Sequence, residues 1–333
     1  MLPKVKNIKK KNSHLEKFVN ILKCVNCDVG GIKLDGKYLR CKNCKKKYQV
    51  VNGVPILLKN SNLFNKKNSK NLFEKRGPKK NLYKKNSHNL YEYICKNIPS
   101  TSGFLYKKKY LKNGYFNSYP IPNIDLPIAK TNKNKLLDLG CGWGRWVFAS
   151  SKKNYISIGV DANINFLKLA NAIARENDYN VIFILADIKK LPFKNNTFDV
   201  VFSYSVIQHF SFINIAKIFS QVRNVLKING IFKFQTMNFF GIRNQFYLMK
   251  RLYRKSKNFD VYYYSITFMK KILKIFFSDI KCENCSFFTQ ARFEDKKHLN
   301  YKGKIFLYGT IISNFLFKNF KFFSDNVYFR LKK

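Results

Sequence analysis

Two hydrophobic patterns alternate along the chain from residue 135 onward. Short, nearly continuous apolar runs predict buried parallel strands over residues 135–139, 156–160, 181–185, 198–204 and 231–236. Between these runs, apolar residues recur every three or four positions, which predicts helices near 144–152, 164–173 and 212–226. A further helix over about 265–277 and a last strand over 326–331 complete the pattern. This alternation predicts an α/β fold with a doubly wound parallel sheet.

Residues with strong local preferences mark the ends of two predicted helices. Asn163 can cap the helix whose apolar face contains Ile164, Leu167, Ala170 and Ile173. The next predicted helix also has one apolar face, formed by Phe212, Ile215, Phe219, Val222 and Leu226. We expect Gly230 to end that helix and to open strand 231–236.

Four cysteines with paired spacing mark a separate unit at residues 20–58. Cys24 and Cys27 form one C-x-x-C pair, and Cys41 and Cys44 form a second after thirteen intervening residues. Each pair makes a tight knuckle that turns two thiolates toward one point, and two knuckles complete the tetrahedral sulfur site that suits Zn(II). Four protein ligands leave no open position, so the zinc is expected to be structural. Four unliganded core cysteines would give so small a unit no comparable stability.

Composition suggests how the rest of the chain is divided. Residues 59–92 are rich in Lys, Asn and Ser and predict a basic linker, followed by a large domain over 93–333. A solvated linker is the preferred interpretation, and contact with RNA or peripheral contact with a membrane surface is the alternative. We expect the cysteine unit to be independent, so that zinc chelation would unfold residues 20–58 and leave ligand binding by the large domain intact.

The charge of the chain allows two explanations. Its 333 residues carry a formal net charge of +46, which usually favours a nucleic acid or an anionic membrane as partner. However, ten of the 64 basic residues are arginine, the better reader of phosphates and bases, and the rest are lysine. The abundant Lys, Asn, Ile, Phe and Tyr all use A/T-rich codons, so nucleotide composition explains the charge equally well.

Segments that would direct the chain to a membrane are short or interrupted. The first residues contain no apolar core of signal-peptide length. The apolar run over residues 305–317 falls short of the roughly 20 residues that span a bilayer. We therefore expect a cytoplasmic protein without a transmembrane segment.

The first predicted strand and the loop after it carry the most specific chemistry, in the sequence LLDLGCGWG at residues 136–144. Gly140, Gly142 and Gly144 supply backbone freedom where the chain turns or lies against a ligand. A dinucleotide loop reads G-x-G-x-x-G, whereas here the third glycine comes one residue early. Asp138 places a carboxylate beside the loop, where it would repel pyrophosphate. The ligand that fits is a nucleoside with an ammonium, a sulfonium and no phosphate, namely S-adenosylmethionine.

Two more acids follow the next two predicted strands. In a doubly wound sheet the ligand binds at the carboxyl ends of the strands, so Asp138, Asp161 and Asp187 are expected to line one pocket. Asp161 can accept hydrogen bonds from both ribose hydroxyls, and Asp187 can accept one from the adenine amine. Ser203, at the end of the fourth strand, is expected to contact the cofactor as well.

Residues 130–240 resemble the class I S-adenosylmethionine-dependent methyltransferases. The segment 137–144 looks like their first motif, 159–161 like their ribose motif, and 186–201 like the adenine motif and fourth strand of the small-molecule and quinone-type branch. The resemblance implies a Rossmann-like methyltransferase sheet in which the three glycines pack against the methionine moiety and Ile188 flanks the adenine. Segment 226–231 resembles that branch's L-K-P-G-G turn but lacks the Pro and the second Gly, which affects turn geometry.

The cysteine unit resembles a different family. Residues 24–58, including the closing sequence YQVVNGVPILL, look like the zinc-ribbon activator subunit of tRNA, rRNA and protein methyltransferases. This resemblance implies a small N-terminal β zinc ribbon fused ahead of a catalytic domain, and it leaves the substrate open.

The sequence offers several candidates for the catalytic residues and for the class of methyl acceptor. Transfer needs alignment of the acceptor and exclusion of water, and a base only if the acceptor must lose a proton early. His209 and Tyr204, after the fourth strand, are the candidate catalytic residues, and Asn238 is a further acceptor-side candidate. The aromatic C-terminal half favours a small or medium acceptor, such as a glycan, lipid-linked or quinone-like hydroxyl or amine. The alternatives are an rRNA or tRNA methyltransferase whose ribbon binds RNA, and a silent scaffold, which the intact acid series argues against.

Overall fold

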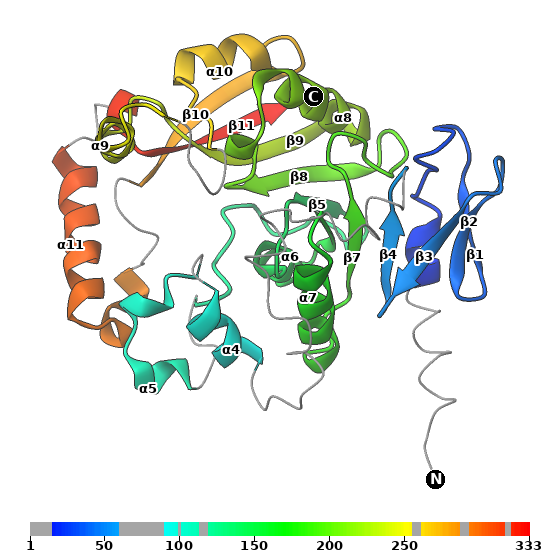
Figure 1. The fold of residues 1–333 in the computed structure, drawn as a ribbon, viewed down its shortest axis with the longest axis horizontal. Coiled ribbons are helices and arrows are strands. Elements are labelled where there is room, and N and C mark those ends of the chain that lie inside the picture. The colour runs from blue at the N-terminus through cyan, green and yellow to red at the C-terminus, as the bar shows by residue number, and fades with distance from the viewer. Residues whose placement is uncertain are drawn as a thin grey trace.

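The computed structural model describes residues 15–59, 90–98, 101–112, 119–254, 261–286, 293–316 and 321–333. Most of the predicted linker lies outside the described residues. The centre of the molecule is a mixed sheet with the strand order β1-β2-β3-β4-β7-β6-β5-β8-β9-β11-β10 (Figure 1).

Parallel strands form the middle of the sheet: β5 (Lys135–Leu139), β6 (Ile156–Asp161), β7 (Val181–Ala186), β8 (Phe198–Tyr204) and β9 (Leu226–Met237). From β5 the chain adds β6 and β7 on one side and then returns to place β8 and β9 on the other. Ligands of α/β sheets bind outside the strand ends at such a reversal. The predicted α/β, doubly wound fold is confirmed.

Helices cover both faces of this sheet (Figure 1). One apolar cluster joins the strands to α4 (Leu90–Asn97), α6 (Arg145–Ser151) and α7 (Ile164–Glu176). A second cluster, on the other face, joins them to α8 (Phe212–Val225) and α10 (Ile266–Leu273). Asn163 caps α7 as predicted, because its Oδ1 accepts hydrogen bonds from the backbone N–H of Asn165 and Phe166 at 2.9 and 3.3 Å. All residues of β7 are buried between these layers.

One edge of the sheet departs from parallel order. β11 (Asn326–Lys332) lies antiparallel between β9 and β10 (Ser278–Ser286). Alternate residues of β11 are buried, and they include Phe329, which stacks on Phe234 of β9 at 5.2 Å between ring centres. The sequence predicts the strand, whereas its position inside the sheet comes from this pairing.

At the opposite edge, the cysteine unit continues the same sheet. Its strands β1 (Ile32–Asp35), β2 (Tyr38–Cys41), β3 (Lys47–Val51) and β4 (Val54–Leu57) pair antiparallel in sequence order. β4 then pairs parallel with β7, so that Leu57 lies opposite Ala186. Asn171 of α7 adds a hydrogen bond from Nδ2 to the carbonyl of Asn52 at 2.6 Å. The unit therefore extends the sheet of the large domain through backbone pairing.

The end of α8 differs from the prediction. The helix stops at Val225, and β9 begins at Leu226 and contains Gly230. Leu226 has extended backbone dihedrals (φ −69°, ψ 140°) and is buried opposite Phe198 of β8. The apolar spacing that predicted a longer helix thus continues into the strand, where pairing with β8 decides the conformation.

The remaining helices and 3-10 turns lie beyond the carboxyl ends of the strands. They are η3 (Gly103–Leu105), α5 (Lys108–Leu111), η4 (Ile207–His209), α9 (Ile242–Lys250), η5 (Phe293–His298), α11 (Tyr301–Leu316) and η6 (Lys321–Phe323). Backbone hydrogen bonds connect some of them, such as that from Asn300 N, before α11, to the carbonyl of Leu105 in η3 at 2.9 Å. Within the described ranges, no helix combines the length and apolar character that a membrane crossing requires.

Candidate functional site

The glycine loop between β5 and α6 turns through left-handed backbone conformations. Gly140, Gly142 and Gly144 have φ angles of 71°, 53° and 87°, which side chains rarely allow. A methyl group on Gly140 would lie 2.3 Å from Val206 Cγ2, and one on Gly144 would lie 2.8 Å from the Phe183 ring. At Gly142 no described atom lies within 4 Å of the equivalent position. The loop is therefore packed at its two ends and open at Gly142.

Asp161, at the end of β6, holds this open turn. Its Oδ2 accepts a hydrogen bond from the backbone N–H of Gly142, and its Oδ1 accepts one from Asn163, both at 2.8 Å. Burial raises the pKa of Asp161, although these backbone N–H groups favour the ionised form. The carboxylate thus fixes the loop and keeps lone pairs at the sheet edge that can accept further hydrogen bonds.

Asp138, in β5, is buried with an unsatisfied oxygen. It is 1% exposed, and its Oδ2 has no hydrogen-bond partner among the described residues. Burial, reinforced by the charge of Asp161, raises the pKa of Asp138 to about 8 against the opposing effect of Arg145. A buried acceptor without a donor costs free energy, and a ligand that donates to it removes that cost.

Asp187 and Ile188 follow β7 and begin the next loop. Asp187 Oδ1 accepts a hydrogen bond from Lys189 N at 2.9 Å, and Lys189 Nζ lies 3.4 Å from Oδ2. Ile188 is buried. The acids Asp138, Asp161 and Asp187 therefore end the neighbouring strands β5, β6 and β7, as the sequence predicts.

The three residues predicted to act at or after the end of β8 have different surroundings in the structure. Ser203 is fully buried, and its hydroxyl donates to the carbonyl of Leu139 at 3.1 Å, so it ties β8 to β5. Tyr204 is half-buried, and its ring centre lies 5.0 Å from that of Trp146 and 5.2 Å from the Arg145 guanidinium. His209 lies on η4, where its backbone N–H donates to Val206 at 3.0 Å. The roles assigned to these three side chains stay predictions, and the bond to Leu139 argues against cofactor contact by Ser203.

The side chain of Asn238, which the sequence suggested as an acceptor-side contact, bonds to neighbouring segments of the chain. It is fully buried, and its Nδ2 donates to the carbonyls of Phe322 and Ser324 at 2.6 and 2.9 Å. Its side chain thus joins β9 to η6 and the start of β11. The sequence suggested an acceptor-side contact because it could not show which segment lies beside β9.

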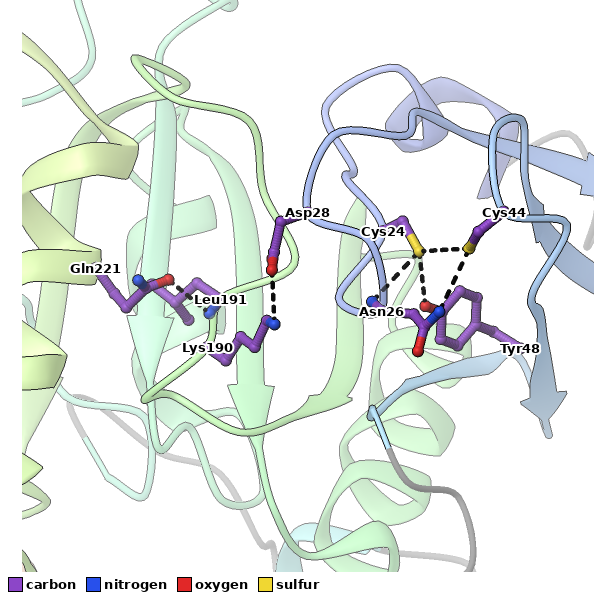
Figure 2. A network of polar contacts seen from close by, with 8 residues as sticks. All are labelled: Cys24, Asn26, Asp28, Cys44, Tyr48, Lys190, Leu191 and Gln221. Carbon is purple, nitrogen blue, oxygen red and sulfur yellow. Dashed lines mark hydrogen bonds and ion pairs between the residues drawn. The ribbon is translucent and has the colours of Figure 1, made fainter.

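The four predicted ligands Cys24, Cys27, Cys41 and Cys44 converge. Their sulfur atoms all lie within 4.8 Å of one another, with Cys24–Cys44 and Cys27–Cys41 separations of 3.6 and 3.7 Å. A tetrahedral site with 2.3 Å zinc–sulfur bonds has sulfur separations of about 3.8 Å. Tyr48 Oη lies 3.0 Å from Cys24 Sγ, and Asn26 N donates to the same sulfur at 3.3 Å (Figure 2). The donor set and its spacing fit Zn(II).

The cysteine unit also contacts the loop that follows Asp187. Lys23 N donates to the carbonyl of Pro192 at 3.0 Å, and Lys194 N donates to that of Ile21 at 2.9 Å. Lys190 Nζ pairs with Asp28 at 2.7 Å, on the side of the cysteine unit that faces this loop (Figure 2). On its other side this loop is held by Gln221, whose Oε1 accepts from Leu191 N at 3.1 Å. The sequence gives no signal for these contacts, because the partners lie far apart in the chain.

Comparisons with known proteins agree with this architecture. Residues 136–230 match the family model of a methyltransferase domain. An uncharacterized protein of Methanocaldococcus jannaschii is 35% identical over 30% of this chain and 40% of its own length. A ubiquinone biosynthesis O-methyltransferase of Pelagibacter ubique is 26% identical over 39% of this chain and 52% of its own. The chain thus spans about half the length, or less, of these relatives.

One solved structure is similar to part of this chain. It is phosphoethanolamine N-methyltransferase 2 of Haemonchus contortus in complex with S-adenosyl-L-methionine, with 19% identity and a TM-score of 0.46. The match covers 73% of this chain and 60% of that one. Residues 136–230 of the present chain are thus similar to a methyltransferase domain, and the relatives that share this region include an O-methyltransferase.

Proposed function

We propose that this methyltransferase domain binds S-adenosylmethionine over the glycine loop and transfers its methyl group to a small or medium acceptor. The observation that carries the proposal is the buried Oδ2 of Asp138, which lacks a donor among the described residues and lies at the strand end beside the open Gly142. A cationic ammonium supplies both the missing donor and the charge that stabilises an ionised carboxylate. A pyrophosphate supplies neither.

The other proposed contacts with the cofactor are made by residues at the ends of the strands and in the glycine loop. Asp161 would accept the ribose hydroxyls through lone pairs that its two backbone donors leave free. Asp187 and the buried Ile188 would bind the adenine, and Gly142 would lie against the methionine moiety. When bound, the cofactor supplies a methyl carbon already activated by the sulfonium charge. The protein then has to align the acceptor and keep water out.

Asp138→Asn tests this assignment through opposite effects on stability and binding. The folded protein keeps the Asp138 proton up to about pH 8, whereas the unfolded chain releases it near pH 3.8. The free energy of unfolding of the wild type therefore falls as the pH rises from about 4 to about 8, by up to about 1.4 kcal/mol per pH unit. Asparagine carries no proton to release, so the Asp138→Asn variant does not show this fall. Chemical unfolding of the ligand-free proteins should show the variant more stable at pH 8 and equal near pH 4. Calorimetry should show S-adenosylmethionine bound about a hundredfold more weakly.

Asp199→Asn is the matched control. The pKa of Asp199 is lowered, because hydrogen bonds from Lys227 and from the backbone of Lys135 outweigh the effect of burial. This variant should lose stability at neutral pH and keep its cofactor affinity. Unchanged affinity in Asp138→Asn would remove the residue from the site.

The acceptor chemistry is proposed as O- or N-methylation. Tyr204 ends β8, and the segment after it contains His209. The segment with Tyr262 and Tyr264 packs on this one, since Tyr264 Oη donates to the Phe210 carbonyl at 2.8 Å. Labelled S-adenosylmethionine added to fractionated cell extract should mark a low-molecular-weight or lipid-extractable product. Label confined to the RNA fraction would favour the RNA alternative instead.

We propose further that Cys24, Cys27, Cys41 and Cys44 hold a structural Zn(II). The short sulfur separations and the closed four-thiolate set support this. Gly30 permits the approach, since a methyl group there would lie 2.3 Å from Cys41 Sγ. Metal analysis of the purified chain should find one zinc per chain, and Cys41→Ser should lose it.

A further inference from the structure

Helix α11 presents its apolar side chains to solvent. The residues that face the protein are small or polar apart from one leucine: Gly303, Leu307, Thr310 and Ser313. The buried hydroxyls of Thr310 and Ser313 bond to the helix's own carbonyls of Phe306 and Gly309, at 2.8 and 2.7 Å. The outward residues, which we call the α11 apolar face, are Ile305, Phe306, Tyr308, Ile311, Ile312 and Phe315.

This arrangement is the reverse of an ordinary surface helix, whose apolar stripe faces the core. Ile305 is 54% exposed, Ile312 57% and Phe315 80%. From Ile305 to Leu316 the helix has no charged residue. Exposed apolar surface of this extent marks a site of contact with another molecule or with a membrane.

A basic rim surrounds the start of the α11 apolar face. Lys302 and Lys304 lie in the first turn, and η5 adds Lys296 and Lys297 together with Glu294. The ammonium of Lys296 lies 5.2 Å from the ring centre of Tyr308 and 5.4 Å from that of Phe293. Positive charge is thus placed at the border of the apolar residues.

A second group of exposed apolar residues lies on and beside α9. Phe240 stacks on Phe322 of η6 at 4.4 Å between ring centres, and Ile242, Phe246 and Met249 are exposed on α9. Figure 1 shows α9 and α11 at the same end of the molecule. α9 ends in Lys250, so it repeats the combination of apolar and basic residues.

We propose that the α11 apolar face lies on an anionic lipid bilayer, with its apolar side chains at the acyl boundary and the basic rim among the headgroups. Charge complementarity selects this occupant. A second copy would bring two basic rims together on chains of net charge +46, and a nucleic acid would leave the isoleucines uncovered. Each lysine near an anionic bilayer and each apolar methylene that enters it strengthens the binding. The proposal is independent of methyl transfer.

Co-sedimentation of the full chain with vesicles tests this surface. Vesicles of phosphatidylcholine with phosphatidylglycerol should retain the protein, and phosphatidylcholine alone should retain far less. The double variant Ile305→Ser with Ile312→Ser should lower retention about tenfold. Both positions are exposed, so the fold should be unchanged. Lys302→Glu with Lys304→Glu should lower retention by phosphatidylglycerol vesicles, and added salt should do the same to the wild type.

The matched control is Ile228→Ser with Ile275→Ser. These isoleucines are 78% and 74% exposed, and they lie at the other end of the sheet, near the start of β9 and the end of α10. The control should bind vesicles as the wild type does, and all variants should keep S-adenosylmethionine binding. Equal retention of the two isoleucine variants, or no retention of the wild type, would refute the proposal. A dimer that only Ile305→Ser with Ile312→Ser dissociates would assign the face to a second copy and equally overturn it.

Discussion

Replacing Asp161 by alanine is expected to remove detectable binding of S-adenosylmethionine, a loss of a hundredfold or more. The substitution deletes the proposed acceptor of the ribose hydroxyls and also the two bonds at 2.8 Å that hold Gly142 and Asn163. The glycine loop then loses its fixed shape as well as its ligand contact. Isothermal titration calorimetry on the wild type and on Asp161→Ala measures the effect directly.

The fold should survive this substitution, since the carboxylate lies at the sheet edge and the apolar clusters on both faces are untouched. Circular dichroism should give the same spectrum for both proteins. Asp35→Ala serves as control, because that acid pairs with Arg40 at the surface, away from the glycine loop, and surface ion pairs contribute little. An Asp161→Ala protein that binds the cofactor with wild-type affinity would place the site elsewhere.

Removal of zinc should unfold residues 20–58 and also weaken cofactor binding about tenfold or more. A structural zinc contributes of the order of 10 kcal/mol to folding, more than so small a ribbon gains from its core. The ribbon pairs with β7 at Leu57 and with the loop that carries Asp187 through Lys23, so its loss frees that loop. Calorimetry on the full chain, before and after chelation, should show the lower affinity. Added zinc should restore it.

Three variants separate metal loss from nonspecific damage. Cys41→Ser should behave like the chelated protein, whereas Cys282→Ser, outside the cluster on β10, should behave like the wild type. Leu22→Ala should keep the zinc and still weaken cofactor binding, because Leu22 is fully buried where its backbone bridges to Phe193. Full cofactor affinity after chelation would instead support the independent ribbon that the sequence suggested.

This coupling shows where sequence analysis and structure diverge. The change in composition at residue 59 predicts two separate units. The parallel pairing of Ile56 with Leu185 joins them across more than a hundred residues of chain. Backbone hydrogen bonds carry no side-chain signature of their partner, so an exposed strand edge and a paired one can have the same sequence.

Local patterns did determine most of the geometry of the proposed cofactor site. The strand before Asp138, the three left-handed glycines and the cap by Asn163 all depend on interactions within a few residues, which the sequence records directly. The same holds for the two cysteine knuckles, because a C-x-x-C turn sets its own geometry.

By itself, then, the sequence determined the order of strands and helices, the acids at the strand ends and the convergence of the thiols. Only the tertiary structure decided that β4 extends the sheet, that Ser203 and Asn238 bond to neighbouring segments, and that α11 turns its isoleucines outward. The reason is physical: local propensities act between residues near in the chain, whereas burial and pairing depend on which distant surface arrives beside them.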